Sequence, residues 1–380
     1  MCLLIAFWYL CSNKKSAGMA LKCGIIGIMS VGKTTIFNCI SNTRGETDTY
    51  GTGVKANLGV IQVPDQRLYE LEKLQPTERV VHTTVDIVDI PGLARGQGDS
   101  SGARLLGEIR NTDALIHVLR CFDDDRLPHI NGSVNPVRDL ENVEFELQVK
   151  DVESVEKKIQ RLERAAKTGD KDARHGIEVL NRYREHLEGF RNASSLEVRP
   201  EDKRYVDDIF LLTVKPVLFV CNVDEASAVK GNQYVSAVRE YLAARGAVPL
   251  VIAGALEAEI ANLSEAADRM EFLRDAGLDE PGVNKLVRAA YEMLDLLTFF
   301  TVGPKEIRAW TITSGMTAPQ AAGVIHSDLE RGFIRAEVMK YADFIALRSE
   351  HACREAGKLS VEGKNYVVDD GDILHIRFNV

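Results

Sequence analysis

The chain has 380 residues, of which 45% are hydrophobic and 27% charged, a balance typical of a globular protein with two or three domains. The formal net charge of -9 excludes a uniformly basic surface of the kind that coats nucleic acid, although a local basic patch stays possible. The seven cysteines are odd in number and form no Cys-x-x-Cys pair. We therefore expect reduced thiols in a cytoplasmic protein, with neither a disulfide framework nor a zinc site.

Residues 1–18, MCLLIAFWYLCSNKKSAG, form an N-terminal extension that differs in character from the rest of the chain. Its apolar part, residues 2–11, is too short to span a bilayer as a helix. Lys14 and Lys15 follow this part, whereas a signal peptide carries its positive charge first. We expect either a native extension or a natural start at Met19, and no membrane role.

Short apolar runs rich in Val and Ile alternate with amphipathic segments through the first part of the chain. Such runs predict the buried strands of a parallel sheet that helices cover on both faces, an α/β fold. The predicted strands lie in residues 21–28, 58–63, 83–90, 114–122, 215–223 and 248–256.

Between Asp139 and Arg204 the strand signal disappears and apolar residues recur at steps of three and four, which predicts an antiparallel helical coiled coil. The predicted seam comprises Val152, Val155, Ile159, Leu162, Ala166, Ile177, Leu180, Tyr183, Leu187 and Phe190. Nine Lys and Arg face four Asp and Glu over residues 157–184, so the tip is locally basic. Two interpretations stay open: a solvated helix face, or a contact with RNA phosphates.

After residue 300 the pattern predicts a small α+β module whose charges nearly cancel, with ten Lys and Arg against eleven Asp and Glu. It therefore carries no basic-patch signal. The predicted elements are strands at 308–312, 333–338 and 366–368, a helix from Thr317 or Ala318 to about Gly332, and a turn plus final strand in 369–378.

A phosphate-binding loop follows the first predicted strand. The stretch GIMSVGKT, from Gly27 to Thr34, has the spacing G-x-x-x-x-G-K-[ST] between a strand and a helix. Gly27 and Gly32 let the backbone curl so that its N–H groups face phosphates, and the helix adds its positive end. Lys33 can reach the β- and γ-phosphates, and the Thr34 hydroxyl can bind Mg²⁺. The predicted nucleotide contacts in this loop are Gly27, Ser30, Val31, Gly32, Lys33, Thr34 and Thr35.

A second element, VDIVDIPG, is an apolar strand that ends in D-x-x-G. Asp89 comes at the carboxyl end of this strand, where a carboxylate can hold Mg²⁺ through water, and the backbone N–H of Gly92 can meet a γ-phosphate. We therefore predict Lys33, Asp89 and Gly92 as the catalytic set. Asp86 alternates to the other face of the strand and is not predicted to take part.

A base-reading element, Asn222–Glu225, ends another buried strand with N-x-x-E, where GTPases have N-K-x-D. Glu225 is one methylene longer than Asp, and Val223 lacks the lysine stem, so both changes weaken the fit to guanine. Asp224 leaves an alternative open, because a shift of one residue would place it in the guanine-reading position. We predict nucleotide contacts at Asn222, Val223 and Glu225, with the loop 251–255 beside the base.

Together these elements resemble the Obg-like ATPases, also called the YchF family, which are related to P-loop GTPases. The resemblance covers residues 19–380 and includes the stretches 110–125, 282–294 and 308–344. It implies a Ras-like domain, an inserted coiled coil and a C-terminal TGS domain of ubiquitin-like shape. The implied ranges are 19–138 and 205–298 for the nucleotide-binding domain, 139–204 for the coiled coil and 299–380 for the TGS domain, after the extension 1–18.

The resemblance implies slow, Mg²⁺-dependent hydrolysis of ATP in preference to GTP, as a switch linked to translation or stress responses. It implies the ribosome, as the large subunit or the whole particle, and ribosomal RNA as partners, with neither DNA nor membrane. Two alternatives are kept. One is a GTP-specific ribosome assembly factor of Obg type, and the other is a nucleotide-sensing ribosome or RNA adaptor with little hydrolysis.

The chain departs from the family pattern around the predicted site. Met29 and Ser30 replace Pro and Asn of the family loop. Gly53 falls where the family's first switch has a Mg²⁺-binding Thr, so the neighbouring Thr52 is the candidate third metal ligand beside Thr34 and Asp89. Leu93 follows D-x-x-G where many GTPases place a Gln that orients the attacking water, which predicts slow intrinsic hydrolysis.

Overall fold

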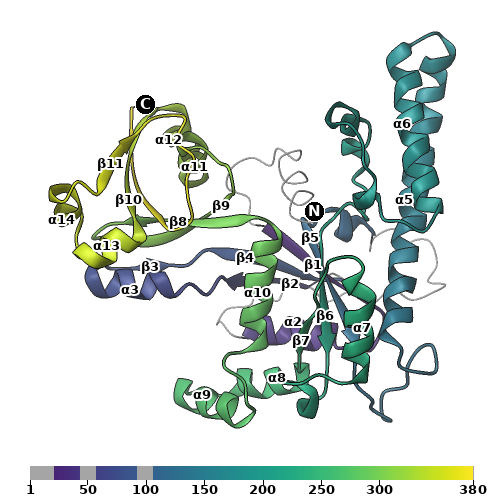
Figure 1. Ribbon diagram of the computed structural model, residues 1–380, viewed down its shortest axis with the longest axis horizontal. Helices are drawn as coiled ribbons and strands as arrows, with labels where there is room; N and C mark the ends of the chain where they lie inside the picture. The colour runs from purple at the N-terminus through teal and green to yellow at the C-terminus, as the bar shows by residue number, and fades with distance from the viewer. Residues whose placement is uncertain (1–20, 43–56, 92–105, 380) are drawn as a thin grey trace.

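The computed structural model describes residues 21–42, 57–91 and 106–379 and contains two six-stranded mixed sheets (Figure 1). The first sheet has the order β2-β4-β1-β5-β6-β7 and the second has the order β11-β10-β12-β8-β9-β3. The strands of the first sheet are β1 (Leu21–Ile26), β2 (Asn57–Gln62), β4 (Thr84–Asp89), β5 (Ala114–Arg120), β6 (Val217–Asn222) and β7 (Leu250–Ile252).

The six strands of the first sheet are those that the sequence predicts, but their directions differ at one edge. β1, β4, β5, β6 and β7 are parallel, whereas β2 pairs antiparallel with β4. The expectation of an all-parallel sheet is therefore wrong at β2. The physical reason is that no helix crosses the first sheet between β2 and β4, and an antiparallel pair needs no such crossover.

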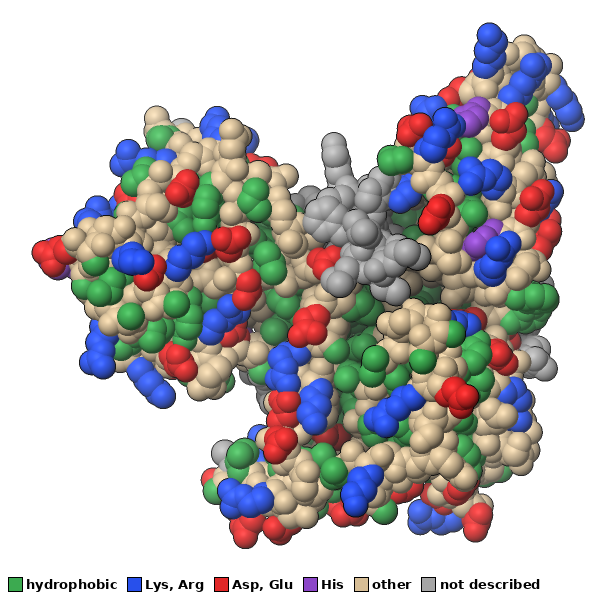
Figure 2. Space-filling model, in the orientation of Figure 1, with side chains coloured by type: hydrophobic (Ala, Val, Ile, Leu, Met, Phe, Trp, Pro, Cys, Tyr) green, Lys and Arg blue, Asp and Glu red, His purple; other side chains and the backbone are tan. Residues whose placement is uncertain are grey.

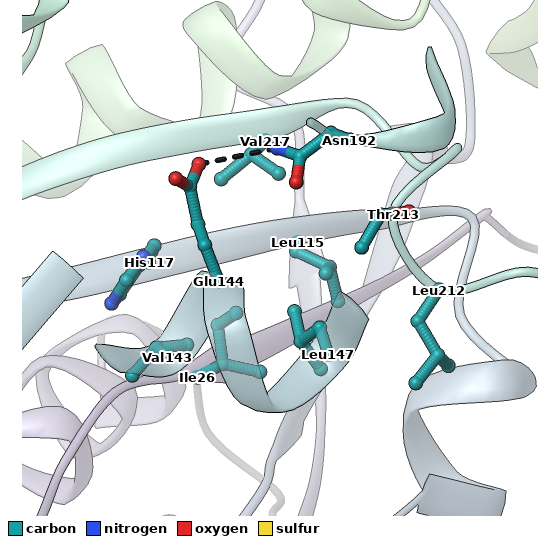
Figure 3. A pocket seen from close by; sticks show the side chains of 10 residues that line it. All are labelled: Ile26, Leu115, His117, Val143, Glu144, Leu147, Asn192, Leu212, Thr213 and Val217. Atoms are coloured by element: carbon teal, nitrogen blue, oxygen red, sulfur yellow. Dashed lines mark hydrogen bonds between the residues drawn. The ribbon is translucent and has the colours of Figure 1, made fainter. Parts of the chain in front are cut away.

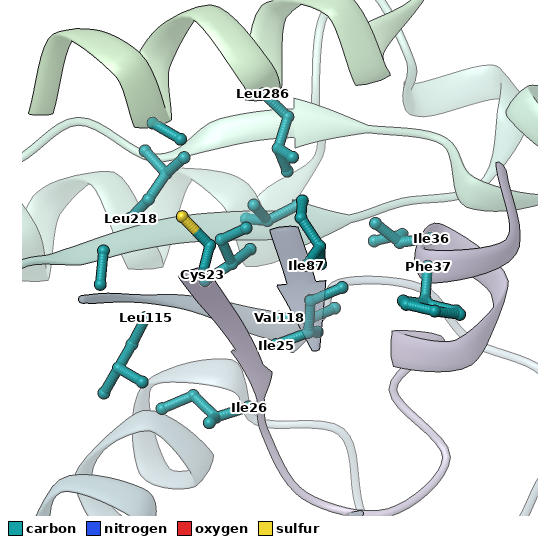
Figure 4. Packing of buried hydrophobic residues seen from close by; sticks show 14 of the residues in the cluster. Cys23, Ile25, Ile26, Ile36, Phe37, Ile87, Leu115, Val118, Leu218 and Leu286 are labelled. Atoms are coloured by element: carbon teal, nitrogen blue, oxygen red, sulfur yellow. The ribbon is translucent and has the colours of Figure 1, made fainter. Parts of the chain in front are cut away.

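Successive side chains of a strand point to opposite faces of the sheet. Because the strands carry apolar side chains on both faces, helices cover both faces of the first sheet. Ile25 and Ile87 meet Ile36 and Leu286 on one face, whereas Ile26 of the other face lies toward α5 (Figure 4). The helices of this part are α2 (Lys33–Asn42), α5 (Pro136–Lys167), α7 (Gln233–Ala243), α8 (Gly254–Asn262), α9 (Ala266–Asp275) and α10 (Gly282–Met293).

The predicted coiled coil is a projecting hairpin of α5 and α6 (Lys171–Glu188), joined by a tight turn (Figure 1). Asn135 and Asp170 cap the two helices with side-chain oxygens, which satisfies backbone N–H groups that have no partner inside a helix. The hairpin buries Val155, Ile159, Leu180, Tyr183 and Leu187, all members of the predicted seam. Lys and Arg side chains gather at its far end (Figure 2).

Phe190 is not part of that seam. α6 ends at Glu188, and Phe190 follows it in a left-handed conformation with φ 57° and a side chain that is 71% exposed. Its ring lies 5.8 Å from that of Phe145. The apolar spacing therefore predicts a helix that is one turn too long, because the chain leaves α6 at Gly189. Three 3₁₀ turns follow, at Ala193–Ser195, Pro200–Tyr205 and Asp207–Ile209.

The second sheet has helices on both faces. Its strands are β3 (Val80–Val81), β8 (Leu296–Val302), β9 (Ile307–Thr313), β10 (Phe333–Lys340), β11 (Leu359–Glu362) and β12 (Asp372–Phe378). One face packs on α11 (Ala318–Ile325) and α12 (Ser327–Arg331). The opposite face packs on α3 (Gln66–Leu74), α13 (Tyr341–Leu347) and α14 (Glu350–Glu355).

Two predictions in this module are wrong. The single helix expected from residue 317 to 332 is broken at His326, whose extended backbone and ring nitrogen cap α12. Residues 366–368 form only an isolated bridge between Val367 and Thr317, because Thr317 is the N-cap of α11 and the chain continues from it as a helix. The elements β3, β8, β11, α13 and α14 were not predicted.

The described cysteines are buried and outside any disulfide: Cys23, Cys39, Cys121, Cys221 and Cys353. Burial raises the pKa of the Cys23 and Cys39 thiols to about 12, so neither is a thiolate at neutral pH. Within the described ranges, no helix combines the length and the apolar character that crossing a membrane requires.

A buried carboxylate fastens the hairpin to the segment that returns from it. Asp151 of α5 accepts hydrogen bonds from the backbone N–H of Leu212 at 2.7 Å and from Thr213 at 2.8 Å. It also accepts the Thr213 hydroxyl at 2.7 Å, and it is 1% exposed.

Asp151→Ala should therefore lower the free energy of unfolding by about 3 kcal/mol, because it leaves two buried N–H groups without a partner. Urea denaturation of the full chain measures this loss. The control Glu156→Ala removes an exposed carboxylate of the same helix and should change stability by less than about 0.5 kcal/mol. Equal stability of the two variants would contradict the assigned role of Asp151.

Candidate nucleotide-binding site

The loop after β1 has the backbone of a phosphate-binding loop. Gly27 has φ 147°, and a Cβ at this position would lie 2.5 Å from the carbonyl oxygen of Val118. Gly32 has φ 91°, and a Cβ there would lie 2.1 Å from the Nδ2 atom of Asn222. Both positions require glycine for conformation and for space. α2 begins at Lys33, so its positive end faces the loop.

The middle of the loop carries the two residues that depart from the family pattern. Ser30 has φ 59°, a left-handed conformation that is uncommon for a residue other than Gly, Asn or Asp. Met29 is 48% exposed, whereas Val31 is buried. The chain therefore holds the loop geometry with Ser at a position where its short side chain tolerates a strained backbone.

Lys33 is folded beneath the loop. Its Nζ atom donates hydrogen bonds to the carbonyl oxygens of Gly27 at 3.1 Å and Ile28 at 2.6 Å. Burial lowers the pKa of Lys33 to about 8, and the charge of Asp89 partly opposes this shift. An incoming anion would stabilise the ammonium form, because it would replace neutral carbonyl partners with a negative charge.

Thr34 and Asp89 meet at the mouth of the loop. The Thr34 hydroxyl donates a hydrogen bond to Oδ2 of Asp89 at 3.0 Å, and Asp89 is 8% exposed. Burial raises the pKa of Asp89, which Thr34 and the Lys33 charge counteract. Adjacent ligands of an octahedral Mg²⁺ ion lie about 3 Å apart, so this oxygen pair fits such an ion. Thr35 follows on α2, while Thr52, Gly92 and Leu93 lie outside the described residues.

Asn222 connects the loop to the neighbouring strand ends. Its Nδ2 atom donates to the carbonyl oxygen of Val31 at 2.8 Å, and its Oδ1 atom accepts the backbone N–H of Gly254 at 3.0 Å. Both ends of the amide are thus engaged within the protein. The sequence suggested a nucleotide contact for Asn222 and placed the loop 251–255, which contains Gly254, beside the base, but it did not predict the hydrogen bond between them.

The segment after Asn222 distinguishes its two acidic residues. Oδ1 of Asp224 accepts the backbone N–H of Ser227 at 2.9 Å and so caps the short 3₁₀ turn η4 (Glu225–Ser227). Glu225 is exposed at the first position of this turn. Val223 is buried, and its backbone N–H donates to Ile252 at 2.9 Å.

His117 of β5 belongs to the core and is 2% exposed. It lines a small buried cavity between the first sheet and α5, where Glu144 accepts a hydrogen bond from Asn192 (Figure 3). Burial and the charge of Lys33 lower the pKa of His117 to about 3. It is therefore neutral at physiological pH and does not serve as a general acid there.

Comparisons with known proteins place this geometry in a family. Residues 22–169 match a family described as 50S ribosome-binding GTPase, and residues 296–379 match the YchF GTPase C-terminal family, described as a protein of unknown function. Proteins named "Ribosome-binding ATPase YchF" are 43% identical in Haemophilus ducreyi over 365 residues and in Bacillus subtilis over 367 residues. Each match covers 95% of this chain and 100% of the relative. The chain belongs to the YchF family.

A solved YchF structure confirms the fold. The YchF GTPase of Schizosaccharomyces pombe is 29% identical, with a TM-score of 0.84 over 96% of this chain and 99% of that chain. The resemblance seen in the sequence is thereby confirmed, together with the α/β P-loop architecture. The two bacterial relatives are named ATPases, and the solved structure is named a GTPase.

Asn222→Ala should weaken nucleotide binding about tenfold, because it removes two buried hydrogen bonds that shape the loop. Asn222→Asp should weaken binding further, by roughly fiftyfold, since it turns an acceptor oxygen toward the Val31 carbonyl. Titration calorimetry measures both dissociation constants, and melting temperatures report whether the variants are folded. Binding by Asn222→Asp at wild-type affinity would show that this amide does not shape the loop.

Proposed function

We propose that the protein is a Mg²⁺-dependent ATPase that hydrolyses ATP slowly and acts as a switch on the ribosome. The carrying observation is the phosphate loop with Thr34 placed 3.0 Å from Asp89, in a chain whose YchF relatives are named ribosome-binding ATPases. Thr34 and Asp89 would hold Mg²⁺, which would supply positive charge to neutralise the charge that develops on the phosphate.

The residues of the loop have separate tasks in this proposal. The N–H groups from Ser30 to Thr35 bind the phosphates, and Lys33 leaves its two loop carbonyls to donate to a phosphate oxygen instead. Thr34 and Asp89 hold the metal ion. Thr52 and Gly92 remain proposed for a third metal ligand and a γ-phosphate contact, respectively.

Adenine is the proposed base, with Val223 and Glu225 beside it. The position of Asp224 supports this choice over the Obg-type GTPase, because its Oδ1 atom accepts the backbone N–H of Ser227 at 2.9 Å, which holds the side chain toward η4. Slow turnover is proposed from Leu93, whose side chain has no group that can orient water.

Mg-ATP should bind at least about tenfold tighter than Mg-GTP in paired titrations, a difference of roughly 1.4 kcal/mol. Turnover without a partner should stay below about 1 s⁻¹, the lower end of the kinase range. Lys33→Ala should abolish hydrolysis, whereas Lys364→Ala, which removes an exposed lysine far from the loop, should have no effect. Tighter GTP binding would favour the Obg-type alternative, and absence of hydrolysis with ribosomes would favour the adaptor.

The hairpin tip is the proposed contact with ribosomal RNA. Arg164, Lys167, Lys171 and Arg174 are exposed around the turn between α5 and α6 (Figure 2). Phosphate contacts of this kind depend on salt, because each one releases condensed counterions.

Lys167→Glu combined with Lys171→Glu should reduce ribosome co-sedimentation about tenfold at physiological salt, since charge reversal turns attraction to phosphate into repulsion. The matched control, Arg239→Glu with Arg274→Glu, reverses two exposed charges on α7 and α9. If both double variants co-sediment like the wild type, the tip is a solvated helix face.

A further inference from the structure

Residues 63–83 leave the first sheet between β2 and β4 and become part of the second sheet (Figure 1). Where this excursion departs and returns, the backbone N–H of Val63 donates to the carbonyl oxygen of Thr83 at 2.8 Å. The two legs are thus tied together at their base. The excursion carries α3 and β3 away from the nucleotide loop and into contact with the C-terminal module.

The excursion is built into the core of the second sheet. Leu68 and Leu71 of α3 are fully buried in a cluster that includes Phe300 and Phe344. β3 pairs parallel with β9, with Val80 opposite Ile307. Side chains in such cores are close-packed, so the excursion cannot shift without moving the second sheet or leaving voids.

Arg67 forms the polar part of this attachment. Its Nη1 atom lies 2.6 Å from Oδ2 of Asp370, and its guanidinium carbon lies 5.1 Å from the centre of the Phe300 ring. Its Nη2 atom also pairs with Asp65, the N-cap of α3, at 2.8 Å. Oδ1 of Asp370 in turn accepts the backbone N–H of Thr298 in β8 at 2.8 Å. One arginine therefore links the start of α3 to a central strand of the second sheet.

The other end of the same strands reaches the nucleotide loop. β4 ends at Asp89, which pairs with Asn57 of β2 and accepts the hydroxyl of Thr34. Each strand has six residues, and an extended strand cannot lengthen further. A displacement of Asp89 along β4 is therefore passed to residues 63–83.

We propose that residues 63–83 couple the nucleotide site to the C-terminal module, with Arg67 as the positioning residue. This inference rests on the proposed function, because it requires that a nucleotide binds at Thr34 and Asp89. A ligand on the C-terminal module must then change nucleotide affinity by the same factor as the nucleotide changes the affinity for that ligand.

Hydrogen exchange of the full chain, with and without Mg²⁺ and a non-hydrolysable ATP analogue, tests this coupling. In the wild type, bound nucleotide should slow exchange in α2 and change exchange in β9 and β12 by about fivefold, the lower end of typical coupling energies. Arg67→Met keeps an apolar side chain over Phe300 but removes the guanidinium group that pairs with Asp370. It should reduce the response of β9 and β12 to less than about twofold and leave that of α2 intact.

Asp370→Asn serves as a second variant, because it removes the charge and keeps the acceptor for Thr298. The matched control is Arg377→Met, which breaks the 3.1 Å pair with Glu337 inside the second sheet and touches no residue of the excursion. Retained responses of β9 and β12 in both Arg67→Met and Asp370→Asn, or no such response in a wild type whose α2 does respond, would overturn the coupling. Absence of a response in α2 would instead overturn the proposed function.

Discussion

The amide of Asn222 is the contact on which the nucleotide site depends, since it fixes the relative positions of three strand ends. Its two hydrogen bonds, at 2.8 and 3.0 Å, join the loop after β1 to the end of β6 and to the start of α8. Only glycine fits at position 32, because the amide of Asn222 occupies the space that a Cβ would take. The phosphate loop is therefore not an independent strand-to-helix turn, because the buried amide of Asn222 holds it against the neighbouring segments.

The two sheets are joined more closely than a chain of separate domains would be. The second sheet takes β3 from between two strands of the first, and β8 follows directly after α10. Tyr291 of α10 adds side-chain hydrogen bonds to Thr298 at 2.9 Å and Thr311 at 3.0 Å. These partly buried polar contacts orient the C-terminal module relative to the nucleotide site.

The sequence was most informative where one short motif determines both local structure and chemistry. The loop from Gly27 to Thr34 and the strand that ends at Asp89 could be predicted because their spacing is dictated by phosphate geometry. The excursion that contains α3 could not be predicted, because its partners are distant in the sequence. Asp370, for example, is separated from Arg67 by 303 positions. Asp224 was ambiguous for a local reason, since only the folded turn shows that its Oδ1 atom accepts the backbone N–H of Ser227.

α5 is one continuous helix of 32 residues, so it measures about 48 Å from end to end. Leu140 and Val143 near its start pack in the cores beside the first sheet, while Ile159 packs against α6. No break separates these two parts. The helix is therefore continuous from the core to the tip of the hairpin. A rotation of about 5° at its buried base would move the tip by about 4 Å.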